Sequence, residues 1–141
     1  MRVLLLTTGL LTLGGCAGLP DPDPAQAWVD LAPPRDTHLQ ALEVDAKNID
    51  DPRYFQVQPG SHELTLRYQF AVQPSNIGPD AEPLWRDCQL NVKFKDFGAG
   101  QRYQVQAGNI GFHPWARLYD EQHTLLAVSY THLTLPTILL V

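Results

Sequence analysis

The chain has 141 residues, of which 44% are hydrophobic and 18% charged, and its formal net charge is -5 at neutral pH. Nucleic acids and anionic lipid headgroups recruit proteins through basic patches, so the acidic balance and the dispersed lysines and arginines exclude both as expected partners. The length suits one small domain with a single core.

The N-terminal segment, residues 1–15, has the pattern of a secretory signal peptide. Arg2 gives it a short positive start, and Val3–Leu13 is mostly aliphatic. Such a segment is removed from the mature protein. A transmembrane helix needs about 20 predominantly apolar residues, and the polar stretch after Leu19 leaves this one too short.

A short motif at the end of this segment points to lipidation. Leu13-Gly14-Gly15-Cys16 resembles the lipobox of bacterial lipoproteins, in which small residues precede a cysteine that carries a diacylglycerol. The resemblance implies that Cys16 becomes the first residue of the mature protein and anchors it to a membrane. Ala17 stands where an aspartate would resemble an inner-membrane retention signal, so we expect the periplasmic face of the outer membrane. The alternative is an ordinary secretory signal with an incidental cysteine.

Residues 16–38 are rich in proline and aspartate, a composition that favours extended backbone over a packed core. We therefore expect a lipidated tether, spanning about 26 Å as a flexible coil and up to about 70 Å when extended. Trp28, Val29 and Leu31 form an apolar island that we expect to dock on the domain. A turn of helix over Ala25–Leu31 is an alternative.

From residue 39 to residue 127 apolar and polar side chains alternate, which is typical of half-buried strands. Seven segments show this pattern or lie between turn signals, namely Leu39–Val44, Arg53–Gln58, His62–Val72, Cys88–Lys95, Tyr103–Ala107, Trp115–Tyr119 and Thr124–Ala127. Short strands without intervening helices predict an all-β fold, a single antiparallel β-sandwich of about seven strands.

Turn residues separate these strands. Pro59-Gly60 suits a type II turn, because proline presets the first central residue and glycine accepts the positive φ of the second. It predicts a hairpin, as do Gly98–Gly100 and Asp120–His123. The long connection Gln73–Pro83 is interpreted as a mobile surface loop, with a functional loop as the alternative.

Part of this pattern resembles a known kind of module. Val44-Asp45, Tyr54-Phe55, Val57 and Pro59-Gly60-Ser61-His62, followed by the alternating strand, resemble the small β-sandwich modules of the PEGA type and related envelope lipoproteins. Ala99–Tyr103 and Leu118–Glu121 look like the later hairpins of small bacterial lipoproteins. The resemblance implies a domain of unknown or non-catalytic role and offers no catalytic residues to carry over.

The last residues resemble a sequence that is not part of a gene. Val128–Thr137 resembles, residue for residue, one reading frame of the transposon adapter used in DNA library preparation. The resemblance implies that residues 128–141 are an adapter-derived artefact and that the sandwich is truncated near Ala127. The alternative is a genuine apolar final strand, which the Leu, Thr and Val content favours.

The sequence contains no recognised catalytic or metal-binding motif. Its histidines lack the spacing of a metal site, no serine stands in a Gly-x-Ser-x-Gly context, and its glycines are too scattered for a phosphate loop. We expect no enzymatic activity, no cofactor and no metal. Cys88 is interpreted as a small buried hydrophobe, because it occupies the apolar phase of its strand.

The candidate partner surface is aromatic, formed by Trp85, Phe112, Trp115 and Tyr119. Such rings either bind sugars and peptides or pack in the core. We therefore expect an envelope lipoprotein that acts as a non-catalytic binding or structural module in the periplasm. The alternatives are an assembly or chaperone-like partner of another envelope protein and a cell-wall glycan binder or enzyme.

Overall fold

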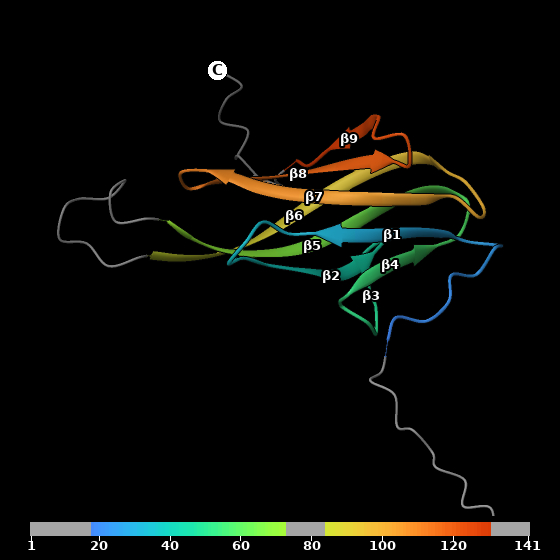
Figure 1. Cartoon of the computed structure of the whole chain (residues 1–141), viewed down its shortest axis with the longest axis horizontal. Helices are drawn as coiled ribbons and strands as arrows, with labels where there is room; N and C mark the ends of the chain where they lie inside the picture. Colours follow the sequence, from blue (N-terminus) through green and yellow to red (C-terminus); the bar gives the residue numbers. More distant parts are fainter. Residues whose placement is uncertain (1–17, 73–83, 131–141) are drawn as a thin grey trace, which may run out of the picture.

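The structure, a computed structural model, describes residues 18–72 and 84–130. Within these residues nine strands form two stacked sheets (Figure 1), and there is no helix. This confirms the predicted all-β sandwich. The strands are β1 (Ala27–Ala32), β2 (His38–Val44), β3 (Lys47–Asn48), β4 (Tyr54–Val57), β5 (Gly60–Val72), β6 (Leu84–Phe97), β7 (Arg102–Ile110), β8 (His113–Asp120) and β9 (Leu125–Val128).

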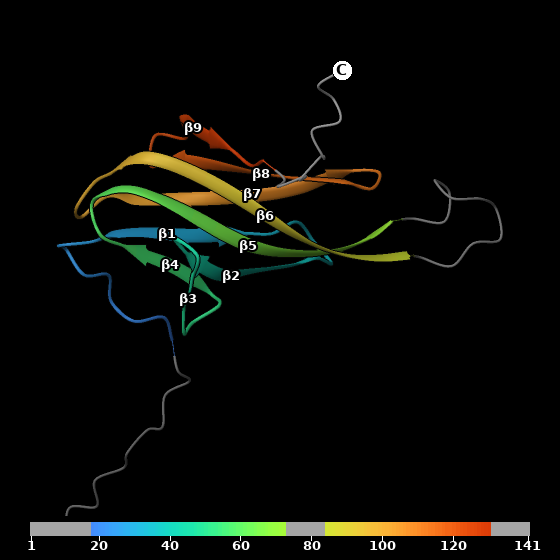
Figure 2. The ribbon, with the colours of Figure 1, turned by 180° about the vertical axis from the view of Figure 1, so that it is seen from behind.

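One sheet has five strands in the order β4-β1-β7-β8-β9, and the other has four in the order β3-β2-β5-β6 (Figure 2). Neighbouring strands are antiparallel except β1 and β7, which are parallel. The core lies between the two sheets. Fully buried side chains of β5 such as Leu66 and Phe70 face Phe55, Val105 and Leu118 of the five-stranded sheet.

The predicted tether is wrong over Ala27–Ala32, because this segment is a central strand of the five-stranded sheet. It pairs with β4 on one side and β7 on the other. Val29 is fully buried and Trp28 is 2% exposed. The island is therefore part of the sandwich, and the helical alternative is overturned. The physical reason is that Ala27, Val29 and Leu31 alternate with polar or outward residues, which gives the strand a core-facing side despite its proline-rich surroundings.

The residues just before β1 are also fixed to the sandwich. Asp23 accepts a hydrogen bond from the amide of Ala25 (2.9 Å) and donates its own amide to the side chain of Gln56 (3.1 Å). The carbonyl of Gln26 accepts from the amide of Gly100 (2.9 Å). The chain from Cys16 to Asp23 spans at most about 25 Å. A lipid on Cys16 would therefore keep the start of the sandwich within about 25 Å of the membrane, whereas the predicted tether would let it move up to about 70 Å away.

Two predicted hairpins are connections between the sheets. Pro59-Gly60 leads from β4 in the five-stranded sheet to β5 in the four-stranded sheet, and Gly98–Gly100 leads back from β6 to β7. Gly60 and Gly100 have positive φ values of 115° and 70°, as such turns require. Turn chemistry specifies a reversal of the chain but does not specify which sheet the next strand joins.

The third hairpin is confirmed. β8 and β9 pair antiparallel, and the amide of His123 donates to the carbonyl of Asp120 (3.0 Å) in the turn between them. The predicted long connection, Gln73–Pro83, lies outside the described residues. It links two strands that pair along their length, from Gly60 opposite Phe97 to Val72 opposite Leu84.

The hairpin between β2 and β3 contains a strained alanine, which leads to a stability prediction. Val44 pairs with Lys47, so Asp45 and Ala46 form a two-residue loop with φ values of 52° and 64°. Hairpin loops of this kind favour Asn-Gly or Asp-Gly, because an L side chain in the left-handed region costs about 1–2 kcal/mol. We expect Ala46→Gly to raise the free energy of unfolding by up to about 1 kcal/mol, after the extra flexibility of glycine in the unfolded chain is subtracted.

Urea unfolding of the two proteins measures this effect. Asp45→Ala serves as the contrast and should destabilise, because the Asp45 carboxylate accepts the amide of Glu63 (2.8 Å) and contacts His62 Nδ1 (2.6 Å). A lower stability for Ala46→Gly would contradict the strained geometry.

Candidate functional site

The outer face of the five-stranded sheet carries the main group of polar and aromatic side chains. On β8, Ala116 and Leu118 are fully buried against the core. Trp115 and Tyr119 are half-buried on the opposite side of the strand. The strand therefore has an inward apolar face and an outward aromatic face.

The outward rings are packed on the protein itself. The Arg117 guanidinium lies 4.5 Å from the ring centre of Trp115, and the Tyr119 ring stacks on His123 at 4.5 Å with an interplanar angle of 6°. Trp115 also lies over Gly108, where a Cβ atom would come within 2.3 Å of the indole. The absence of a side chain at Gly108 lets the indole lie against the backbone of β7.

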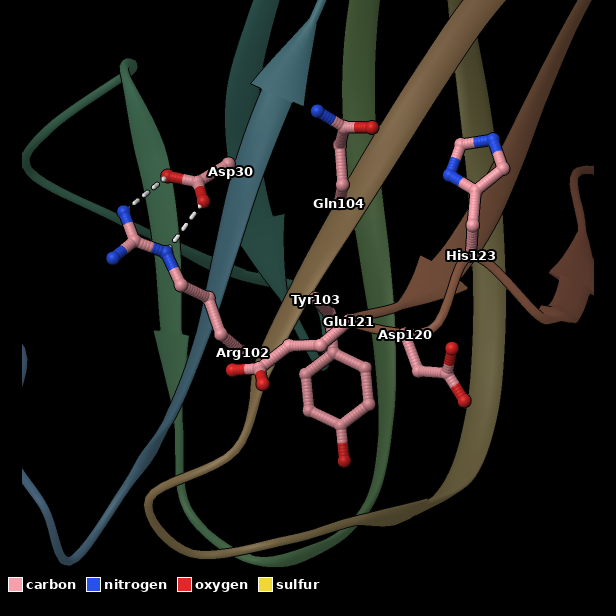
Figure 3. Close-up of a pocket in the computed structure, with 7 residues that line it drawn as sticks. All are labelled: Asp30, Arg102, Tyr103, Gln104, Asp120, Glu121 and His123. Atoms are coloured by element: carbon pink, nitrogen blue, oxygen red, sulfur yellow. Dashed lines mark hydrogen bonds and ion pairs between the residues drawn. The ribbon is translucent and has the colours of Figure 1, made fainter.

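A depression of about 250 Å³ lies next to the His123 ring (Figure 3). Its lining residues come from β1, β7, the end of β8 and the β8–β9 turn, and are Asp30, Arg102, Tyr103, Gln104, Asp120, Glu121 and His123. The Arg102 guanidinium is paired with the Asp30 carboxylate, with Nε 2.8 Å from Oδ2. The depression is thus polar and carries both signs of charge, which suits hydrogen bonding to a polar ligand.

Sequence reasoning missed the part of this face that β1 provides. Trp28 stacks on Tyr54 with ring centres 4.2 Å apart, and its Nε1 donates to Asp30 (2.8 Å). Asp30 in turn accepts from Arg102, which is 72 residues away in the chain. The alternation of Ala27–Ala32 was the available signal for placing Trp28 and Asp30 together on one face of a strand.

Asp30 makes part of the stability depend on pH. Burial alone raises the pKa of Asp30, but the hydrogen bonds from Arg102 and Trp28 outweigh it and hold the pKa below its ordinary value. In the unfolded chain an aspartate has a pKa of about 3.9. The unfolded state therefore takes up the proton at a higher pH than the folded state, and acid favours unfolding. This contribution is complete above about pH 5 and is lost as pH falls through the folded-state pKa.

Asp30→Asn tests this assignment, because asparagine keeps an acceptor for Trp28 but does not titrate. We expect the variant to be less stable than the wild type at pH 7 and the difference to shrink at pH 3. Urea unfolding at the two pH values measures it. A difference that is constant with pH would contradict a role for the ionised carboxylate.

The other two aromatic candidates lie elsewhere. Trp85 is on β6, in the four-stranded sheet, and is 58% exposed. Phe112 lies in the turn between β7 and β8, with the Arg86 guanidinium 5.6 Å from its ring centre. The four predicted partner residues are thus divided between the two sheets, and only Trp115 and Tyr119 share the outer face of the five-stranded sheet.

Cys88 is a free thiol that is half-buried and packs against the core, close to its predicted environment. Within residues 18–72 and 84–130 no group of three or more His, Cys, Asp or Glu side chains is arranged to hold a metal ion. In the same residues no helix is long and apolar enough to cross a membrane. Cys16 lies outside the described residues.

Comparison of the chain with protein-family models, with curated proteins and with solved structures finds no match.

Proposed function

We propose that the protein is a lipoprotein of the bacterial cell envelope, with acylated Cys16 holding a non-catalytic β-sandwich module at the periplasmic face of the outer membrane. The observation that carries the proposal is the motif Leu13-Gly14-Gly15-Cys16 at the end of an apolar segment. The attachment of Asp23 to the sandwich supports it, because the module begins only seven residues after the cysteine. Its binding face is the outer face of the five-stranded sheet, with the depression beside Asp30 and Arg102.

Replacing the cysteine tests the anchor. Wild-type protein expressed in a Gram-negative host should incorporate labelled palmitate, partition into detergent and accumulate as a larger precursor in globomycin. Cys16→Ser should lose all three properties. Cys88→Ser is the matched control, since Cys16 and Cys88 are the two cysteines of the chain. A Cys16→Ser protein that is processed and localised like the wild type would rule out lipidation.

The residue after the cysteine tests the outer-membrane location. We expect wild-type protein to sediment with outer membranes in a sucrose gradient and Ala17→Asp to move to the inner-membrane fraction. Ala17→Ser is the control and should stay with the wild type. Wild-type protein in the inner-membrane fraction would contradict the proposed location. It would not contradict lipidation, which the Cys16→Ser experiment tests separately.

Binding of a cell-wall glycan is a second candidate function. Polar side chains such as Gln104 line the depression, and the Tyr119–His123 stack lies beside it, a combination typical of sugar binding. Purified protein should then co-sediment with peptidoglycan, and His123→Ala, which removes a ring that lines the depression, should weaken binding while Trp85→Ala does not. Failure to bind, or binding unchanged by His123→Ala, would remove this candidate.

An assembly or chaperone-like role for another envelope protein is the remaining alternative. In this case the partner would contact the long connection and Trp85. A photo-crosslinker at Trp85 should then capture one polypeptide reproducibly in intact cells. A crosslinker at Trp115 is the control for contacts on the other sheet.

A further inference from the structure

Within residues 18–72 and 84–130, the long side of β6 that faces away from β5 is paired at one point. The strand is 14 residues long and pairs along one side with β5. Along its other side the described residues provide a single main-chain contact, in which Asn91 and Tyr130 exchange two hydrogen bonds of 2.9 and 3.3 Å. The unpaired amides and carbonyls of an edge strand of this length can form hydrogen bonds with another strand, and natural proteins usually cover or shorten such edges.

The contact at Asn91 shows which backbone groups face the open side. Amide and carbonyl of one residue point to the same side of a strand, and the side alternates with each residue. Since Asn91 directs both groups to Tyr130, the groups of Asp87, Gln89 and Lys93 also face away from β5. These residues therefore offer a regular row of donors and acceptors from 87 to 93.

The side chains along this row match a second copy of the same row. When two β6 strands are placed antiparallel about a two-fold axis at Leu90, Asp87 comes opposite Lys93 of the other copy, and Gln89 opposite Asn91. The two-fold axis produces the Asp87–Lys93 pair twice. Both side chains are exposed, although Asp87 also accepts from Arg67 of its own chain at 2.9 Å. Opposite charges directly across an antiparallel pair stabilise it, and like charges destabilise it.

We propose that β6 pairs antiparallel with β6 of a second copy of this chain, which joins two four-stranded sheets into one continuous sheet. Each copy gives up the contact between Asn91 and Tyr130 and gains hydrogen bonds at residues 87, 89, 91 and 93. Tyr130 thus competes with the second copy for the edge of β6. The proposal goes beyond the anchoring function and does not depend on lipidation of Cys16.

Charge reversal tests the pairing in the whole chain carrying Cys16→Ser. Sedimentation equilibrium should show a monomer–dimer equilibrium, with the dissociation constant raised at least about tenfold by Asp87→Lys or by Lys93→Asp. The double variant Asp87→Lys/Lys93→Asp should return it to within about threefold of the parent, because the opposite charges face each other again. Asp36→Lys, a charge reversal away from β6, should have no effect.

Disulfide trapping tests the register. In a Cys16→Ser/Cys88→Ser background, Asp87→Cys with Lys93→Cys should give a covalent dimer on oxidation, because paired residues lie about 5.5 Å apart between Cα atoms. Within one chain these positions are six residues apart on an extended strand, too far for a disulfide. Gln69→Cys with Lys93→Cys is the control and should stay monomeric. A chain that ends at Ser129 should dimerise more tightly, since Tyr130 no longer competes.

Hydrogen exchange distinguishes the other occupants of this edge. In the proposed dimer the amides of Asp87, Gln89 and Lys93 are protected increasingly as protein concentration rises. A monomer whose β6 amides exchange rapidly at every concentration would overturn the proposal. So would a monomer in which they are slow at every concentration, because the edge would then be covered by its own chain.

Discussion

A chain that begins at Leu39 is expected not to fold, whereas one that begins at Asp23 should fold to the same sandwich as the full chain. The shorter chain lacks β1, which lies between β4 and β7 in the five-stranded sheet. Its removal leaves β4 without a partner strand in that sheet and exposes the edge of β7 with which β1 pairs. It also removes Val29 and Trp28, which are 0% and 2% exposed.

Circular dichroism and urea unfolding measure the outcome. The chain from Asp23 should unfold cooperatively at the midpoint of the parent, and the chain from Leu39 should show no cooperative transition. A synthetic peptide of residues 23–37 added to the shorter chain should restore it, since the missing strand is then supplied in trans. Cooperative unfolding of the chain from Leu39 alone would contradict the central position of β1.

The strands that could be predicted from the sequence are those in which alternation alone carries the signal. In β5, Leu64, Leu66 and Phe70 are fully buried, as their spacing of two residues predicts. The same reasoning places Trp115 and Tyr119 on the outer face of β8. Such patterns are local, because side chains on a strand point to opposite faces in turn whatever the strand pairs with.

The arrangement of the strands depends on contacts that no local pattern contains. Pro59-Gly60 has the composition of a hairpin turn, but the strands that it joins belong to different sheets. β1 pairs in parallel with β7, so Trp28 stands beside Arg102. The Asp30–Arg102 ion pair of the candidate site follows from this pairing, and could therefore not be predicted before the topology was known.

The error over the tether has a different cause. Proline and aspartate are frequent on both sides of β1. A prediction made from the average composition of residues 16–38 therefore misses a strand of six residues within them. The alternation of Ala27, Val29 and Leu31 was visible within those residues. Where a short alternating run contains a tryptophan, burial of the large ring provides enough free energy to fix the strand in spite of its flanks.

Trp28→Ala should therefore be among the most damaging single substitutions, lowering the free energy of unfolding by about 3–5 kcal/mol. The indole is nearly inaccessible although it lies on the outer face of its sheet. It is in contact with the Tyr54 ring and hydrogen-bonded to Asp30. The substitution leaves a cavity, removes the stacking and deprives the carboxylate of a donor. Denaturant unfolding followed by circular dichroism measures the loss.

Trp28→Phe separates the two contributions, because phenylalanine retains an aromatic ring against Tyr54 but cannot donate to Asp30. We expect it to lose about 1–2 kcal/mol, since Asp30 keeps its ion pair with Arg102. A loss as large as that of Trp28→Ala would place the stabilisation in the hydrogen bond rather than in burial of the ring. A loss below about 1 kcal/mol for Trp28→Ala itself would mean that the ring is not packed against Tyr54 and that the outer face of the five-stranded sheet extends across β1 as an open surface.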